Sequence, residues 1–236
     1  MSALIARLAG ARTVRRVLVP ASSVLLLVGM VGSLVPFYAG AVFDFKRAMI
    51  SDLASPGSNP HGYLLADVGM VLWGALLVPV AAWLYRGLRR LHRGFAGLGA
   101  LVFAAGLVGA IFIGVTGPVA DVNSTVHVYV AFATFISLAA GTLMLLGLAM
   151  YWRVEVRRGW LALGLATILQ ACILGFLLYL LRGQINDEFF FFNDTDVLRS
   201  IAFCEWSLGV ANVAYVWLLV GAVGTIEQGA ESARRL

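Results

Sequence analysis

The sequence predicts an all-α membrane protein, a bundle of six transmembrane helices in one domain over residues 1–236, with both termini in the cytoplasm. The chain is 61% hydrophobic and 12% charged, with a mean hydropathy of +0.92, whereas a soluble domain carries about 25% charged residues. The apolar residues fall in six stretches, each close to the roughly 20 residues that cross a bilayer. The basic residues flank these stretches, which is the topological use of positive charge.

The expected spans are residues 17–38, 60–85, 94–115, 126–151, 159–181 and 201–223. Each is apolar around its circumference, as a helix in lipid must be, because lipid offers no partner to polar groups. Asn59 and Pro60 predict the N-cap and the first residue of the second helix. The short cytoplasmic loops predict that consecutive spans are antiparallel neighbours in one compact bundle.

The orientation follows from the basic residues. The N-terminus, the second loop, the fourth loop and the C-terminus hold all of them except Lys46, Arg47, Arg182 and Arg199. The positive-inside rule therefore places both termini in the cytoplasm of a cell inner (plasma) membrane. Lys46 is the single lysine beside many arginines, a bias typical of a high-GC bacterial genome. Because the arginines form no stripe with interleaved aromatics, nucleic acid is not an expected partner.

Several ionisable residues fall inside the predicted spans, where each costs about 2.5–3.5 kcal/mol at the helix centre. Asp67 in the second span, His127 in the fourth and Glu205 in the sixth are expected at one depth, below the outer surface. The remaining polar candidates lie in the outer loops near that layer: Ser51, Asp52, His61 and Asp121.

Helical spacing sharpens this prediction. His127, Ala131 and Phe135 share one face of the fourth span, and Glu205, Gly209 and Asn212 share one face of the sixth. Gly209 would let another helix approach closely. We therefore predict a polar pocket in the outer-leaflet half of the bundle, formed by the second, fourth and sixth helices.

Three interpretations of this pocket remain open. It binds a polar lipid head group; it is an acid/base or zinc centre built from Asp67, His127 and Glu205; or it is a network of interhelical hydrogen bonds. No metal-ligand spacing such as HxxxH or HExxH occurs, so no cofactor is expected, with zinc as the alternative.

Short motifs resemble those of the DRAM/Frag/Sfk family of six-span membrane proteins. They are Ile50-Ser51-Asp52 in the first outer loop, His127 followed by Ala131 and Phe135, and the tract Ala202-Phe203-Cys204-Glu205-Trp206 in the last span. The stretch from Gly109 to Asp121 is also similar to a bacterial six-span family of unknown function. The resemblance implies six helices and a role in handling or sensing membrane lipids, with Ser51, Asp52, His127, Glu205 and Trp206 as the corresponding positions. It does not by itself imply an enzyme.

The predicted function is therefore that of a lipid-handling or lipid-sensing membrane protein, with membrane lipids as partners. The main rival is a membrane-embedded lipid hydrolase or acyltransferase that uses the same residues. A small proton-coupled transporter is a weaker prediction, because the polar groups lie on one side of the membrane and no inverted repeat is visible. A purely structural subunit, with the pocket filled by side chains, is the fourth.

Overall fold

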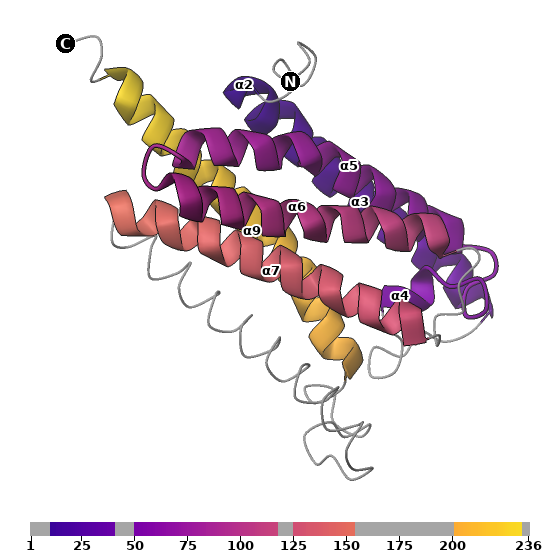
Figure 1. The fold of residues 1–236 in the computed structure, drawn as a ribbon. Helices are drawn as coiled ribbons and strands as arrows, with labels where there is room; N and C mark the ends of the chain where they lie inside the picture. Colours follow the sequence, from indigo (N-terminus) through magenta and orange to yellow (C-terminus); the bar gives the residue numbers. More distant parts are fainter. Residues whose placement is uncertain (1–9, 41–49, 118–124, 154–200, 233–236) are drawn as a thin grey trace.

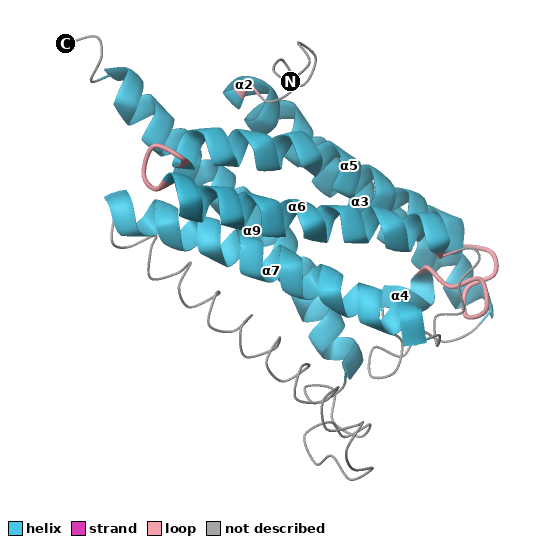
Figure 2. Ribbon diagram, viewed as in Figure 1, coloured by secondary structure: helices cyan, strands magenta, loops and turns pink. Residues whose placement is uncertain are grey.

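The computed structural model describes residues 10–40, 50–117, 125–153 and 201–232, and no strand occurs in these ranges. The helices are α2 (Ala11–Thr13), η1 (Val14–Leu18), α3 (Val19–Gly40), α4 (Ile50–Leu53), α5 (Tyr63–Leu88), α6 (Arg93–Thr116), α7 (Thr125–Arg153) and α9 (Ile201–Ser232). Figure 2 shows that helix makes up almost all of the described chain, with short loops at the ends of the bundle.

Five described segments are long and apolar enough to cross a membrane: Ala11–Phe37, Tyr63–Leu88, Arg93–Thr116, Tyr129–Ala149 and Glu205–Glu227. They coincide with five of the six predicted spans to within a few residues, apart from the earlier start of the first. The sixth, residues 159–181, lies outside the described residues. The fold is therefore that of a polytopic α-helical membrane protein.

The first span begins earlier than the sequence predicted. α2, η1 and α3 follow one another without a break, and η1 is a π-helical turn just before Pro20. Proline has no backbone N–H to donate to the preceding turn, and π-turns are one way in which a helix accommodates such a loss. Val14 and Val19 are fully buried here, so this turn packs into the bundle.

The start of the second span is a correction. α5 begins at Tyr63 with Gly62 as its N-cap, so Asn59 and Pro60 do not start the helix. Residues 59–62 instead form a turn in which the Asn59 carbonyl accepts hydrogen bonds from Gly62 N–H (3.1 Å) and Tyr63 N–H (3.0 Å). The Asn59 side chain is used elsewhere in the fold, and the local pattern could not reveal this.

α3, α5, α6 and α7 pack as consecutive antiparallel neighbours, as the short loops predicted, while α9 crosses them and contacts α7, α5 and α3 (Figure 1). Glycines permit these close approaches. A Cβ on Gly29 of α3 would lie 2.9 Å from the Gly69 Cα of α5, and a Cβ on Gly106 of α6 would lie 2.6 Å from the Leu138 nitrogen of α7. Lipid tails are as apolar as leucine, so close packing of small residues supplies much of the association between such helices.

The outward faces of the helices remain apolar. Val28 and Val35 on α3 and Leu101 and Val108 on α6 are 60–69% exposed. Runs of exposed aliphatic side chains suit lipid and not water. The interior is formed by one large cluster that includes Trp83, Phe103 and Tyr215, each buried to 2% exposure or less.

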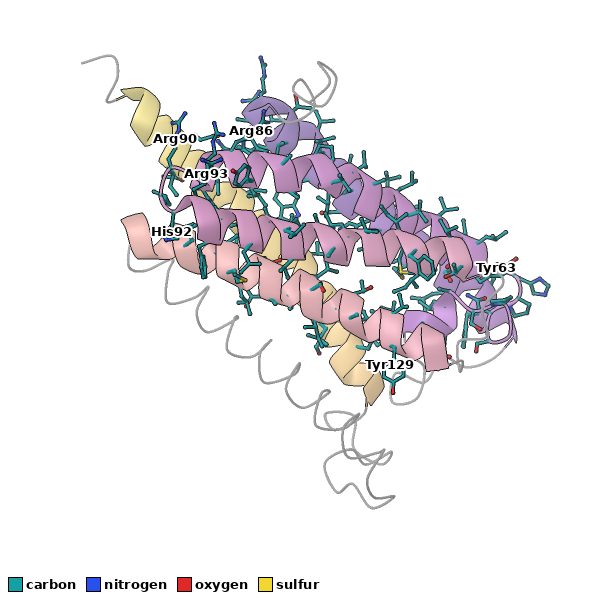
Figure 3. All side chains as sticks on the ribbon, viewed as in Figure 1. Tyr63, Arg86, Arg90, His92, Arg93 and Tyr129 are labelled. Atoms are coloured by element: carbon teal, nitrogen blue, oxygen red, sulfur yellow. The ribbon has the colours of Figure 1, made fainter. Side chains whose placement is uncertain are left out.

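Several arginines of the described helices lie together at one end of the bundle. Figure 3 places Arg86, Arg90 and Arg93 at one end and Tyr63 and Tyr129 at the other. α2 and the C-terminal end of α9 lie toward the arginine end, and α4 lies at the opposite end (Figure 1). We call the latter the α4 end.

Candidate functional site

Glu205 connects α9 to the start of α4. Its side chain is 7% exposed, and its Oε2 accepts a hydrogen bond from the Ile50 backbone N–H at 3.1 Å. Ser51, the next residue of α4, also interacts with this carboxyl group. The first turn of a helix has free N–H groups, and a carboxylate is a favoured partner for them. Glu205 therefore caps α4 from a helix 155 residues away in sequence.

Asn59 holds the other end of the α4 segment. Its Nδ2 lies 3.0 Å from the Ser33 carbonyl oxygen, 2.8 Å from Ser33 Oγ and 3.1 Å from the Leu53 carbonyl oxygen. Ser33 Oγ in turn donates to the Leu53 carbonyl at 3.0 Å. All of these groups are buried, so the bonds are shielded from water and fix the segment to α3.

A small apolar cluster completes the attachment of α4. Leu53 and Ala54 at its end are buried with Ala66 of α5, and Phe37 and Trp206 pack against them. The α4 segment thus lies across the end of the bundle, joined to α3, α5 and α9.

A cavity of about 80 Å³ lies in the bundle next to α4. Every long described helix contributes to its wall, together with the first residues of α4. Its lining is mostly aliphatic, aromatic or methionine, and the polar side chains are Ser51, Thr134, Glu205 and Asn212. The full lining is Leu26, Met30, Ile50, Ser51, Met70, Trp73, Ala110, Ile113, Ala131, Thr134, Phe135, Leu138, Glu205, Gly209 and Asn212.

Two of the polar groups in this wall have no protein partner. Asn212 is 3% exposed and Thr134 is 5% exposed. Neither the amide of Asn212 nor the hydroxyl of Thr134 makes a hydrogen bond to any part of the chain that the structure describes. Buried polar groups are nearly always paired, and leaving one unpaired costs about 1–3 kcal/mol. The cavity wall therefore contains two residues whose buried polar atoms have no partner among the described residues.

The two predicted helical faces both point to this cavity. Glu205, Gly209 and Asn212 of α9 line it, and so do Ala131 and Phe135 of α7. Gly209 serves the predicted close approach, since a Cβ there would lie 2.8 Å from Ile50 Cδ1. The backbone of His127 belongs to α7, but its side chain lies outside the described residues, as does Asp121.

Asp67 is placed differently from the prediction. It does not line this cavity, for which α5 supplies Met70 and Trp73. Its carboxylate is 2% exposed and packs against α6, where a Cβ on Gly117 would lie 2.6 Å from Oδ1. Neither carboxylate oxygen has a hydrogen-bond partner among the described residues. The side of α5 on which it lies depends on how α5 and α6 pack, which position along the helix does not reveal.

The remaining predicted residues lie around α4. His61 is exposed in the loop before α5. Asp52 accepts a hydrogen bond from Ser58 Oγ at 3.3 Å and interacts electrostatically with Glu205. Trp206 packs against the Leu53 cluster. Within the described ranges, no group of three His, Cys, Asp or Glu side chains is arranged to hold a metal ion.

Sequence reasoning missed Thr134 and Asn59. Thr134 lies seven residues after His127, so it belongs to the same helical face as Ala131 and Phe135 and could have been included. Asn59 carried no such signal, because its partners in α3 are 26 residues away.

Together, the apolar outer faces, the charged end and the internal cavity define a polytopic helical membrane protein with a site inside its bundle. Residues 26–224 match the family model described as protein of unknown function (DUF998), and the chain belongs to this family. Neither the curated proteins nor the solved structures contain a match to it.

Proposed function

We propose that this protein is a six-span protein of a bacterial inner (plasma) membrane that handles or senses lipids by binding them in the cavity beside α4. Both termini are cytoplasmic, and the cavity lies in the outer-leaflet half of the bundle. Membrane lipids are its partners.

The direction of the helices supports six spans. α7 and α9 run the same way, toward the end that carries the arginines (Figure 1). The connection between the end of α7 and the start of α9 is residues 154–200. It contains the apolar stretch 159–181, which is long enough for one crossing.

The observation that carries the lipid proposal is the composition of the cavity wall. Ligand sites are mainly apolar with a few convergent polar groups, and this wall combines aliphatic, aromatic and methionine side chains with two unpaired polar groups. Its position inside a membrane bundle makes an amphiphile the natural occupant. Ser51, Glu205 and Trp206, which the DRAM/Frag/Sfk resemblance selects, meet at α4 beside it, and this supports the lipid role that the resemblance implies.

The proposal is tested by filling the cavity. Ala131 lines it, while Ala133 on the same helix is exposed toward lipid. Ala131→Phe should abolish the retention of co-purifying lipid, measured by native mass spectrometry after extraction in mild detergent. Ala133→Phe is the matched control and should leave retention unchanged. Equal retention in both variants would contradict lipid binding at this site.

The orientation is tested by thiol labelling. His61 and Arg90 are both exposed and lie at opposite ends of α5. In a background without Cys172 and Cys204, a membrane-impermeant maleimide should label His61→Cys in intact spheroplasts, and Arg90→Cys only after lysis. The opposite pattern would place the termini outside.

One contact favours the rival hydrolase or acyltransferase. Ser51 and Glu205 both line the edge of the cavity and interact with each other, and a hydroxyl beside a potential base is the first requirement of a serine nucleophile. A fluorophosphonate probe that labels the protein, but not its Ser51→Ala variant, would establish this rival. Absence of labelling would leave Ser51 as a partner that positions Glu205.

A further inference from the structure

The cavity also carries information about the charge of its ligand. This step rests on the proposed lipid binding and concerns the class of lipid. Among the described residues that line the cavity, Glu205 is the only ionisable one, and no arginine, lysine or histidine is present. Phosphate recognition in proteins relies on arginine, lysine or clustered backbone N–H groups. The described part of the wall offers none of the basic side chains that an anionic head group needs.

Glu205 is already engaged by the protein. The Ile50 N–H donates to its Oε2, and Ser51 interacts with the same carboxyl group. Asp52, which interacts electrostatically with Glu205, adds a second acidic group at this end of the cavity. A phosphate brought here would meet two carboxyl groups of like charge. A cationic ligand would have to compete with α4 for the same oxygens.

The unpaired groups lie deeper. Asn212 is seven residues beyond Glu205 on α9, which is about 10 Å along the helix axis. The Thr134 hydroxyl lies against α6, where it would meet a Cβ on Gly109. A charged group at that depth would have to leave water almost completely, which costs far more than moving a neutral hydroxyl or carbonyl.

The Asn212 amide offers both a donor and an acceptor, and the Thr134 hydroxyl offers the same pair. A ligand hydroxyl can accept from one and donate to the other, and a ligand carbonyl can accept from both. Met30, Met70, Trp73 and Phe135 provide soft and aromatic surface around these atoms.

We infer that the ligand of this cavity is a neutral lipid whose polar group is a hydroxyl or a carbonyl, held by the Asn212 amide and the Thr134 hydroxyl, and not a phospholipid head group. α4 closes the site at its outer end, with Glu205 holding α4 in place.

The test uses three photoreactive probes with the same diazirine-bearing hexadecyl chain, ending in a hydroxyl, a phosphate or a trimethylammonium group. The full-length protein is reconstituted in phosphatidylcholine nanodiscs, and crosslinked residues are mapped by mass spectrometry. The alcohol should label Met70, Trp73 or Phe135 at least about tenfold more than either charged probe, and unlabelled hexadecanol should compete. All three probes should label lipid-facing positions such as Leu101 alike.

Two variants test the recognition atoms. Asn212→Leu and Thr134→Val should reduce cavity labelling by the alcohol about tenfold and about threefold, in proportion to the hydrogen bonds removed. Thr142→Val is the matched control, because the Thr142 hydroxyl lies on the same helix but bonds the Leu138 carbonyl at 2.6 Å. It should leave labelling unchanged.

The outcomes separate the two proposals. If a charged probe labels the cavity as strongly as the alcohol, lipid binding stands and the neutral class is wrong. If Asn212→Leu and Thr134→Val leave alcohol labelling unchanged, these two groups do not recognise the ligand, and the inference is overturned. If every probe labels only lipid-facing residues, the proposed function fails as well.

Discussion

Asn59 should control whether α4 stays closed over the cavity. Its side-chain nitrogen is the common donor to the Ser33 carbonyl, Ser33 Oγ and the Leu53 carbonyl. Asn59→Leu keeps a similar volume but removes both hydrogens that serve these three acceptors. The α4 segment then remains attached mainly by Glu205 and by the apolar cluster around Leu53.

The magnitude follows from the bonds that are lost. Each buried hydrogen bond contributes about 0.5–1.5 kcal/mol, and two donor hydrogens give about 1–3 kcal/mol in total. Leu53 keeps one partner, since Ser33 Oγ still donates to its carbonyl. A change of about 2 kcal/mol in the free energy of opening increases the open population about 30-fold.

Thiol labelling reports this opening. Ala54 is 3% exposed at the end of the segment, so Ala54→Cys in a background without the native cysteines is protected while α4 is closed. Asn59→Leu should raise its labelling rate about 30-fold. Ser58→Ala, which removes an exposed 3.3 Å contact to Asp52, should change the rate less than about twofold.

A second reporter separates local opening from unfolding. Ala149 is fully buried in α7, so Ala149→Cys should remain protected in the Asn59→Leu protein. If Asn59→Leu and Ser58→Ala label alike at position 54, the hydrogen bonds of Asn59 do not hold the segment, and our account of α4 is refuted.

Three further predictions concern the bundle. Gly141→Ala should lower the stability measured by thermal unfolding by about 1–3 kcal/mol, because its Cβ would overlap the backbone of α6. Gly147→Ala on the same helix is the control and should be neutral, because a Cβ there would have nothing within 4 Å. Gly117→Ala should also destabilise the protein, since the new methyl would lie 2.6 Å from an Asp67 oxygen. Combining it with Asp67→Ser should recover part of the lost stability. If the stability changes of the two single substitutions simply add in the double variant, the contact is contradicted. Glu205→Gln should increase the labelling rate of Ala54→Cys about tenfold, because an NH₂ group would replace an acceptor that faces a backbone donor. An unchanged labelling rate would show that Glu205 does not hold α4.

Much of the fold was predictable because a membrane helix is recognised by local properties. The helices from Tyr63, Arg93, Thr125 and Ile201 begin within three residues of the predicted spans, since length and apolar composition alone decide whether a segment can lie in lipid. The faces that contain Glu205, Gly209 and Asn212 on α9, and Ala131 and Phe135 on α7, also followed from helical periodicity.

The partners of individual polar residues were not predictable. Glu205 caps α4 across 155 residues, and Asn59, expected to start a helix, fastens α4 to α3 instead. Asp67 lies against α6, apart from the cavity that Glu205 and Asn212 line.

By itself, the sequence determined which segments are helices that suit a bilayer and which of their faces carry polar groups, because both are properties of consecutive residues. Only the tertiary structure decided which faces meet, where a cavity remains between them and which polar atoms stay unpaired in its wall. These depend on the rotation of each helix about its own axis, which is set by contacts between glycines and side chains distant in sequence.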